Sequence, residues 1–259
     1  MIPAPLLQVR DLHVVYSAGN RRTHAVRGVD LDVLEGEALG IVGESGSGKS
    51  TLARAMSGLE TWRSGTIHYR GAPLPSSGRL PRDVRLDLQM VFQDPASALN
   101  PRRRIGAAIA AAVVARHGRR PSRTELEELL ADVGLPPAFV DRYPRQASGG
   151  QLQRVVIARA LAAEPRVLLA DEPVSALDVT VQAQVLDLLA DLREQRGLTV
   201  VMVSHDLAVI RHVCDRVAVV QHGLVVESGP VDEVIGNPQH PYTRELLAAV
   251  PEPVVADRT

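Results

Sequence analysis

The amino-acid sequence predicts an α/β fold built around a mostly parallel sheet with helices on both faces. Residues 39–42, 167–170 and 198–203 form continuous apolar runs, which are typical of strands buried on both faces. Segments with helical character separate these runs, and such alternation is the pattern of strand–helix–strand units with parallel strands. A length of 259 residues, with 45% hydrophobic and 23% charged residues, is enough for one large or two small globular domains.

Two strands are expected near the N-terminus, before the first buried run. Residues 6–16 mix apolar and polar residues in rough alternation, and residues 26–34 form a second strand candidate. Residues 17–23 are polar and contain glycine, so they are expected to form a loop. The segments that complete this region are a turn at 35–37, a short strand at 65–69 and an exposed loop rich in Pro, Ser and Gly at 70–82.

The most informative stretch is residues 43–51, GESGSGKST, which follow the apolar run 39–42 and open a helical segment at 52–56. A strand, a Gly-rich loop and a helix in this order are what a phosphate-binding P-loop requires. Glycines let several backbone N–H groups point at one anion, and the helix N-terminus adds a partial positive charge. A flexible Gly/Ser loop is the alternative, but Gly-Lys-Ser directly after a buried strand argues against it.

This loop predicts that the chain binds a nucleoside triphosphate. Lys49 is expected to reach the β- and γ-phosphates, and the Ser50 hydroxyl to complete a Mg²⁺ shell. The other residues of the loop that are expected to contact the nucleotide are Gly43, Ser45, Gly46, Gly48 and Thr51.

A helical block interrupts the α/β pattern between residues 101 and 164. Its expected helices are an Ala-rich segment at 105–116, a segment at 126–133 opened by a Ser122-to-Glu125 capping box, and a segment at 149–163 stopped by Pro165. The α/β pattern then resumes with a helix at 179–195 ending at Gly197, a helix at 207–212, hairpin strands at 216–221 and 224–227, and short helices at 232–235 and 242–249.

Two acids, Asp171 and Glu172, follow the apolar run 167–170. In P-loop proteins such a strand lies beside the P-loop strand, so that the acids at its carboxyl end face the triphosphate. Asp171 is expected to hold Mg²⁺ through water, and Glu172 to polarise the attacking water. A solvated pair of acids at a strand end is the alternative, and the preceding P-loop argues against it.

Charge and cysteine content exclude several classes of protein. A net charge of −1 carries no overall electrostatic footprint for nucleic acid, so no nucleic-acid partner is expected. Cys214 is the single cysteine, which rules out an internal disulfide and a multi-cysteine zinc site. The N-terminus shows no secretory signal, and the apolar run 107–115 is too short to cross a bilayer, so we expect a chain that is soluble or held at a membrane by a partner.

Six motifs occur in one order along the chain: the P-loop, Gln93 in VFQDP, the stretch Ser148-Gly149-Gly150-Gln151, Asp171-Glu172, the stretch from Ser175 to Asp178, and His205 in VSHD. In this order they resemble the nucleotide-binding domain of an ABC transporter over residues 6–230. The resemblance implies a RecA-like P-loop NTPase core over 1–230 with an N-terminal antiparallel β subdomain and a helical subdomain inserted at about 94–165. A short helical extension over 231–259 is expected to follow.

The resemblance also implies roles within one subunit, with ATP and Mg²⁺ as ligands. Tyr16 matches the aromatic residue that stacks on adenine, although a tyrosine at a strand end can also serve packing alone. Gln93 matches the residue that senses Mg²⁺ and the attacking water and links the site to the membrane subunits. His205 matches the histidine that contacts the γ-phosphate, whereas a lone histidine after a buried strand is more often structural.

Other motifs match residues that act across a dimer of ATPase subunits. Ser148, Gly149, Gly150 and Gln151 match the signature that contacts the γ-phosphate bound to the opposite subunit, and Asp178 matches a residue that crosses the interface. The family has Leu before Ser-Gly-Gly-Gln, and this chain has Ala147 instead. The substitution removes an apolar anchor and no phosphate ligand.

Two further stretches are similar to the dipeptide, oligopeptide and nickel importers of the family: residues 92–102, FQDPASALNPR, and residues 237–247, NPQHPYTRELL. They imply an ATP-hydrolysing subunit that powers uptake of peptides, nickel or metal chelates from the cytoplasmic face of the cell membrane. The implied partners are a second ATPase subunit, identical or different, two transmembrane permease subunits and, indirectly, an extracytoplasmic solute-binding protein.

Three rival functions explain fewer of these motifs. An ABC ATPase that handles DNA or ribosomes would carry coiled-coil insertions, zinc cysteines or a second cassette, and an adaptor without hydrolysis would not need Glu172 and His205. A P-loop kinase or GTPase leaves the Ser148 stretch unexplained. Arg102, Arg103 and Arg104 are expected to be a solvated helix start, and the His212–Cys214 pair has too few ligands for a metal site.

Overall fold

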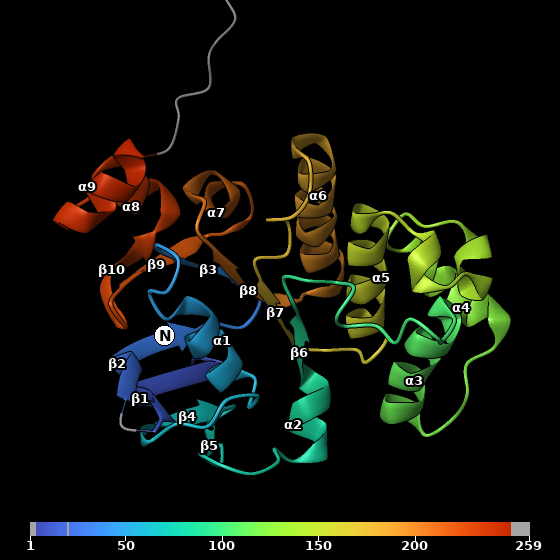
Figure 1. Cartoon of the computed structure of the whole chain (residues 1–259), viewed down its shortest axis with the longest axis horizontal. Coiled ribbons are helices and arrows are strands. Elements are labelled where there is room, and N and C mark those ends of the chain that lie inside the picture. The colour runs from blue at the N-terminus through green and yellow to red at the C-terminus, as the bar shows by residue number, and fades with distance from the viewer. Residues whose placement is uncertain (1–3, 20, 250–259) are drawn as a thin grey trace, which may run out of the picture.

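The computed structural model describes residues 4–19 and 21–249, and over these residues the chain forms two sheets with flanking helices (Figure 1). The smaller sheet is antiparallel and has the order β2-β1-β4-β5. Its strands are β1 Leu7–Ala18, β2 Arg21–Val33, β4 Ser64–Tyr69 and β5 Ala72–Pro73. The expected N-terminal antiparallel sheet is therefore present.

The loop expected at residues 17–23 is wrong for residues 17, 18 and 21–23, because the β1–β2 ladder includes them. Tyr16 pairs with Thr23, and Ser17 pairs with Arg22. Pairing between strands uses backbone groups, so polar residues can extend a ribbon whose side chains face solvent. The exposed loop expected at residues 70–82 is likewise broken by the two-residue strand β5.

The larger sheet has the order β10-β9-β3-β8-β7-β6, and all its neighbouring pairs are parallel except β10 with β9. Its strands are β3 Ala38–Val42, β6 Leu88–Val91, β7 Val167–Asp171, β8 Thr199–Ser204, β9 Arg216–Gln221 and β10 Leu224–Pro230. Along β7, Leu168 packs into one hydrophobic core and Leu169 into the other. Burial on both faces explains why these strands are continuously apolar.

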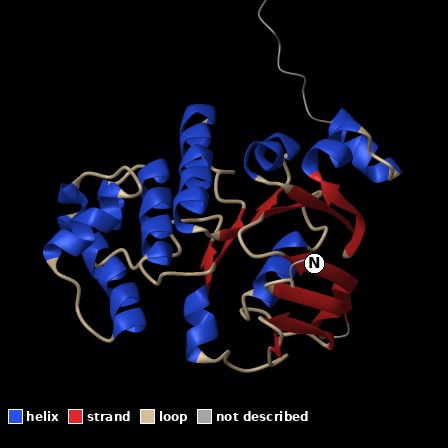
Figure 2. Ribbon diagram, turned by 180° about the vertical axis from the view of Figure 1, so that it is seen from behind, coloured by secondary structure: helices blue, strands red, loops and turns tan. Residues whose placement is uncertain are grey.

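The two cores lie on opposite faces of the larger sheet. One core fills the space between the two sheets and includes the buried side of α1, Lys49–Met56. The other core joins the larger sheet to the remaining helices (Figure 2). The helices that contribute to this core are α5 Gly149–Leu161, α6 Val179–Arg196, α7 Leu207–Val213, α8 Val231–Gly236 and α9 Pro241–Ala248, together with the other helices of the inserted block.

The inserted helical block lies beyond β6 at one end of the molecule (Figures 1 and 2). It contains α3 Ile105–His117, α4 Arg123–Ala131, the 3₁₀ turns Pro137–Asp141 and Pro144–Gln146, and α5. The predicted capping box is present, since Ser122 Oγ accepts from the Glu125 N–H and the Glu125 carboxylate accepts from the Ser122 N–H. α4 therefore begins three residues before the expected start at 126.

The element α2, Arg82–Asp87, and the strand β6 that follows it have no counterpart among the sequence predictions. Asp87 is a buried acid near the C-terminal end of α2. It accepts from Tyr69 of the smaller sheet at 2.9 Å and from Arg116 of α3 at 3.1 Å. This carboxylate therefore joins both the smaller sheet and the helical block to the core.

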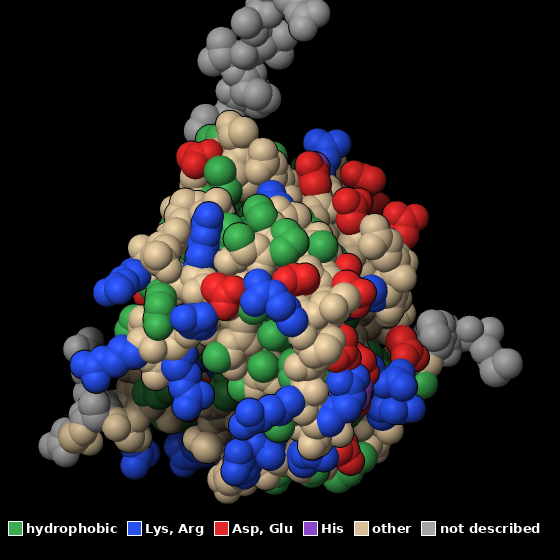
Figure 3. Space-filling view, turned by 90° about the vertical axis from the view of Figure 1, so that its right-hand side faces the viewer, with side chains coloured by type: hydrophobic (Ala, Val, Ile, Leu, Met, Phe, Trp, Pro, Cys, Tyr) green, Lys and Arg blue, Asp and Glu red, His purple; other side chains and the backbone are tan. Residues whose placement is uncertain are grey.

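Arg102, Arg103 and Arg104 are exposed at the start of α3. Arg104 donates to Asp141 at 2.8 Å, and Arg123 of α4 donates to the same carboxylate at 2.9 Å. Figure 3 views the side that carries the helical block and shows basic side chains with acidic and hydrophobic ones between them. This pairing fits the expectation of a solvated helix start.

Cys214 is buried after α7, and burial is the main cause that raises the pKa of its thiol to about 12. Because only the thiolate is nucleophilic, we expect iodoacetamide at pH 8 to alkylate the native chain at least about 100-fold more slowly than the denatured chain. Mass spectrometry of timed samples measures this ratio, and equal rates would contradict the burial.

His212 pairs with Asp187 at 2.7 Å, and over the described ranges no cluster of three metal-ligating side chains occurs.

Candidate active site

The loop between β3 and α1 has a backbone that only glycine can follow at two positions. Gly48 has a φ of 107°, and a Cβ there would lie 2.2 Å from the carbonyl oxygen of Ala25 in β2. At Gly43 a Cβ would lie 2.1 Å from the carbonyl oxygen of Val220 in β9. The two glycines therefore let the loop fold tightly against neighbouring strands.

Helix α1 begins at this loop with no side chain capping its first N–H groups. Uncapped N–H groups and the positive end of the helix dipole together form a site for an anion. Lys49 lies across the loop, where its ammonium donates to the carbonyl oxygens of Gly43 at 2.7 Å and Glu44 at 2.8 Å. Burial lowers the pKa of Lys49, and the nearby carboxylates of Glu172 and Asp171 oppose this effect.

The parallel sheet brings Asp171 to the first turn of α1. Ser50 Oγ donates to the Asp171 carboxylate at 2.6 Å, and Asp171 is 2% exposed. A hydroxyl and a carboxylate side by side at a phosphate site suit Mg²⁺, which takes one or two protein oxygens and fills its remaining positions with phosphate oxygens and water. The donor set therefore fits the expected ion.

Glu172 has a left-handed backbone with a φ of 47°, which is uncommon for a residue with a side chain. Its N–H donates to Val203 of β8 at 3.0 Å, and Ser175 Oγ donates to its carbonyl oxygen at 3.1 Å. These bonds hold a strained backbone in place, and strain of this kind gathers at functional sites.

Two polar side chains, Gln93 and His205, lie at the Glu172 carboxylate. Gln93, which follows β6, donates through Nε2 to Glu172 at 3.0 Å and to Ser175 at 3.2 Å. His205, which follows β8, has Nδ1 3.4 Å from the same Glu172 oxygen. The carboxyl ends of three neighbouring strands thus bring Gln93, Glu172 and His205 together.

Tyr16 stands at the other end of the site, on β1. Its hydroxyl donates to Glu60 at 2.8 Å and lies 3.3 Å from the Thr51 hydroxyl of α1, and the residue is 39% exposed. The ring is therefore held by its hydroxyl end while one part of it stays open to a ligand.

One cleft of about 510 Å³ joins these parts. The predicted residues that line it are Tyr16, Ser45, Gly46, Gly48, Lys49, Ser50, Thr51, Gln93 and Glu172. Gly43 and Asp171 lie directly behind this lining, and His205 lines a smaller neighbouring cavity with Glu172 and Ser175. The structure thus places at one site residues that are separated by up to 189 positions in the sequence.

The remaining predicted residues lie elsewhere on this chain, and none of Ser148, Gly149, Gly150, Gln151 and Asp178 lines the cleft. Ser148 caps α5 by a capping box with Gln151, and Asp178 caps α6 by accepting from the Val181 N–H at 3.0 Å. The starts of α5 and α6 lie side by side. Gly150 is so close to Val181 that a Cβ on Gly150 would lie 2.3 Å from the Val181 side chain. The partly buried Ala147 packs against the core beside them.

Sequence reasoning missed several residues that line the cleft: Thr23, His24, Ala25, Arg27, His222 and Gly223. Backbone hydrogen bonds bring the β9–β10 turn to the loop, since Gly223 donates to Ser47 at 2.8 Å and accepts from Arg27 at 2.8 Å. No local pattern marks these residues, because pairing between distant strands places them. Among residues 4–19 and 21–249, no helix has the length and hydrophobicity needed to span a bilayer.

Comparisons with known proteins show which families and solved structures the chain is similar to. Residues 26–175 match the family model described as ABC transporter, and residues 226–259 match the one described as oligopeptide/dipeptide transporter, C-terminal region. An ATP-binding cassette solved as a dimer after hydrolysis, with ADP and Pi bound, is 30% identical with a TM-score of 0.77, covering 87% of this chain and 98% of that one.

Two curated relatives span most of the chain. The oligopeptide transport ATP-binding protein OppF of Escherichia coli (strain K12) is 46% identical over 96% of this chain and 78% of its own length. The di/tripeptide transport ATP-binding protein DppF of Pseudomonas aeruginosa (strain UCBPP-PA14) is 44% identical over 95% of this chain and 79% of its own length.

Proposed function

Because the chain belongs to the ABC transporter family of ATP-binding proteins, we propose that it is the ATP-hydrolysing subunit of an importer and drives transport through partner membrane subunits. The observation that carries the proposal is the cleft in which Lys49, the Ser50–Asp171 pair and the Glu172 carboxylate adjoin. Such a cleft has a place for the phosphates, a place for Mg²⁺ and a base beside the phosphate end.

ATP hydrolysis in this cleft follows from the positions of the side chains. The phosphates lie on the N–H groups of the loop and α1, and Lys49 neutralises charge on them. Glu172 orients and polarises the water that attacks the γ-phosphate. Gln93 and His205 lie against the Glu172 carboxylate and hold it in position. Lys49 and His205 stabilise the negative charge that develops on the transferred group.

Ser50 and Asp171 are the residues that would hold Mg²⁺, with Gln93 close to the same place. When bound, the ion would offset the negative charge of the phosphates. The buried Asp171 and the Ser50 hydroxyl are already in contact, so little reorganisation is needed to present their oxygens to the ion.

We place the Ser148 stretch in the site of a second ATPase subunit. Its helix start carries the partial positive charge of a helix N-terminus, which attracts an anion, yet it lies outside the cleft of its own chain. A two-fold dimer offers each helix start to the ATP of the other chain and makes two composite sites. ATP would then hold the dimer closed, and hydrolysis would release it. The partner subunit is either a second copy or a similar chain.

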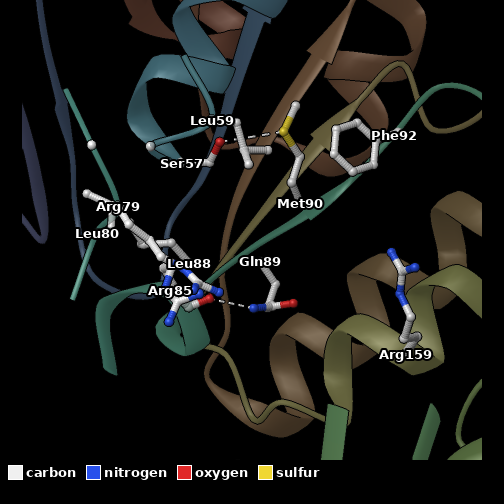
Figure 4. Close-up of a pocket in the computed structure, with 12 residues that line it drawn as sticks. Ser57, Leu59, Arg79, Leu80, Arg85, Leu88, Gln89, Met90, Phe92 and Arg159 are labelled. Atoms are coloured by element: carbon white, nitrogen blue, oxygen red, sulfur yellow. Dashed lines mark hydrogen bonds between the residues drawn. The ribbon is translucent and has the colours of Figure 1, made fainter. Parts of the chain in front are cut away.

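The contact with the membrane subunits lies next to Gln93. A groove of about 470 Å³ lies between the end of α1, α2, β6 and α5. Figure 4 shows Phe92, the residue directly before Gln93, among the side chains that line it. Apolar side chains from Leu59, Leu80, Met90 and Phe92 line it, and Arg79, Arg85 and Arg159 stand around them. An amphipathic segment with acidic residues suits this surface, and a permease segment there would hold the subunit at the cytoplasmic face of the membrane.

Peptides are the cargo that we propose, on the basis of the C-terminal region match and of relatives named for oligopeptide and di/tripeptide transport. Reconstitution with the permease pair tests this choice: ATP-dependent uptake of labelled peptides is expected. Uptake of nickel or a metal chelate without peptide uptake would overturn the peptide assignment and leave the ATPase assignment intact.

A mixing experiment tests the shared site. Lys49→Ala disables the phosphate loop, and Ser148→Arg places a bulky charge at the helix start that faces the other subunit's phosphate. Each variant alone is expected to be inactive. In an equal mixture half of the dimers pair one chain of each kind, and each such dimer has one intact site, so activity of about a quarter of wild type is expected.

Phosphate release by single variants and by mixtures measures this effect. The control is a mixture of Lys49→Ala with Lys49→Ala,Ser148→Arg, which contains no intact site and should stay inactive. A Lys49→Ala and Ser148→Arg mixture with no more activity than this control would contradict a site shared between two copies of the chain.

A further inference from the structure

We propose that Tyr242, in the C-terminal region of the chain, is a positioning residue for the phosphate-binding loop. Its hydroxyl accepts a hydrogen bond from the backbone N–H of Glu44 at 2.8 Å, across 198 positions of sequence. The inference rests on the proposed nucleotide site and adds to it a residue from outside the segment that matches the ABC transporter model.

Hydrogen bonds hold both peptide groups of Glu44, since Tyr242 accepts from the N–H of the first and Lys49 donates to the carbonyl oxygen of the second. The Glu44 N–H donates to Tyr242, and the Glu44 carbonyl oxygen accepts from Lys49 Nζ at 2.8 Å and from the Ser47 N–H at 3.2 Å. The backbone on both sides of the Glu44 Cα is therefore hydrogen-bonded before any nucleotide binds. Its neighbours Ser45 and Gly46 are exposed, so Tyr242 holds the edge of an otherwise open loop.

Tyr242 itself is rigidly placed. The residue is 3% exposed in α9, packed in the core that joins the larger sheet to the helices. Burial is the main cause that raises the pKa of Tyr242, so the phenol stays neutral and keeps one geometry over the pH range of the cell. The His240 ring caps α9 by accepting from the Tyr242 N–H at 3.2 Å.

A single carboxylate, Glu227 of β10, ties α9 to the sheet. It accepts from the N–H groups of Gln239 at 2.8 Å and His240 at 3.0 Å, and from the Thr243 hydroxyl at 2.5 Å. β10 pairs with β9, and β9 pairs with β3, the strand that leads into the loop. The stretch HPYT thus has one residue that anchors the helix, Thr243, and one that contacts the loop, Tyr242.

The expected effect is on nucleotide affinity. Without the hydroxyl the loop populates other conformations, and the apparent dissociation constant rises by the inverse of the fraction that stays competent. The loss of one hydrogen bond that leaves a backbone N–H unpaired corresponds to a rise of about 5- to 150-fold in the Kd for ATP. The turnover at saturating ATP should stay within about twofold, because ATP binding itself restores the loop.

The test compares Tyr242→Phe, which removes only the hydroxyl, with Thr243→Val, which removes the anchoring hydroxyl in the same helix. Calorimetric titration with MgATP, steady-state kinetics and thermal unfolding are measured for both and for wild type. Tyr242→Phe is expected to raise the Kd and KM for ATP with little change in kcat, and Thr243→Val to lower the Tm without changing either constant by more than about twofold.

Two results would overturn the proposal. One is an unchanged Kd in Tyr242→Phe; the other is an equal rise in both variants, which would mean that α9 acts through general stability. If wild type binds no ATP, the proposed function fails instead, and the contact is then judged by amide hydrogen exchange without nucleotide.

If Tyr242→Phe does not fold, amide hydrogen exchange of the wild-type protein tests the proposal instead. In nucleotide-free wild type, the Glu44 amide is expected to exchange at least about tenfold more slowly than the amides of Ser45 and Gly46 in the same loop. Equal rates at the three positions would show that the hydroxyl does not hold the loop.

Discussion

Glu172→Gln is expected to keep ATP binding and to slow turnover by at least about 100-fold, because the amide keeps the shape of the side chain but cannot polarise the attacking water. The structure supports this role through the strained backbone at Glu172 and through the donation from Gln93 to its carboxylate at 3.0 Å. An amide at position 172 still lines the cleft, so the affinity for MgATP should change by less than about threefold.

The measurements are phosphate release for kcat and equilibrium titration for the Kd of MgATP. Glu44→Gln is the matched control, since it makes the same chemical change on an exposed side chain in the loop and leaves the backbone contact with Tyr242 intact. If turnover of Glu172→Gln equals that of the control, Glu172 is not the base. With chemistry slowed and binding retained, Glu172→Gln is also expected to accumulate an ATP-bound dimer, which light scattering detects.

Lys49→Ala is expected to abolish tight ATP binding. Lys49 is 4% exposed and lies in the phosphate loop near the carboxylates of Asp171 and Glu172, which would otherwise repel the triphosphate. Removing one partner of a buried, hydrogen-bonded charge pair corresponds to a rise in Kd of about 30- to 4,000-fold. Arg103→Ala is the control, because it removes an exposed positive charge outside the cleft. A Kd for Lys49→Ala within threefold of this control would contradict the role of Lys49.

The affinity for ATP is also expected to depend on pH, because Lys49 loses its positive charge as pH rises. Burial lowers its pKa, so the ammonium is present at low pH and is lost, as pH rises, at a lower pH than for an ordinary lysine. ATP affinity should therefore begin to fall below the usual lysine pKa of about 10.4. Lys49 is the only lysine in the sequence, so an amine-specific reagent reports on this group and the N-terminus alone. Its labelling at rising pH, with and without ATP, measures both the titration and the protection.

The elements of the core could be read from the sequence wherever burial is complete. β3, β7 and β8 are buried at every position, and each was predicted within one or two residues. The helices α3 and α5 were predicted from local signals, namely the Ala-rich composition of residues 105–116 and the Pro165 that follows residues 149–163. The expected helix at 242–249 is present as α9. The last ten residues of the helical extension expected over 231–259 lie outside the described residues.

Strands that form only by pairing with a neighbouring strand could not be predicted from the sequence. The end of the β1–β2 ladder carries polar residues such as Ser17, Arg22 and Thr23, and β6 is four residues long, so neither has a hydrophobic period of its own. Each exists because a neighbouring strand offers backbone groups to pair with. The same reason applies to Ala25 and Gly223, which line the cleft through long-range pairing alone.

The sequence by itself determined the chemical parts of this protein: the glycines and lysine of the phosphate loop, the adjacent acids at the end of β7, and the order of motifs that identifies the family. These are local, because each depends on residues that are neighbours along the chain. Only the tertiary structure decided which parts meet. It set Gln93 and His205 on the Glu172 carboxylate, kept the Ser148 helix start out of its own chain's cleft, and brought Tyr242 to the Glu44 peptide. Such contacts join residues far apart in sequence, and they form only when buried strands align and two cores fill, which no short stretch of sequence specifies.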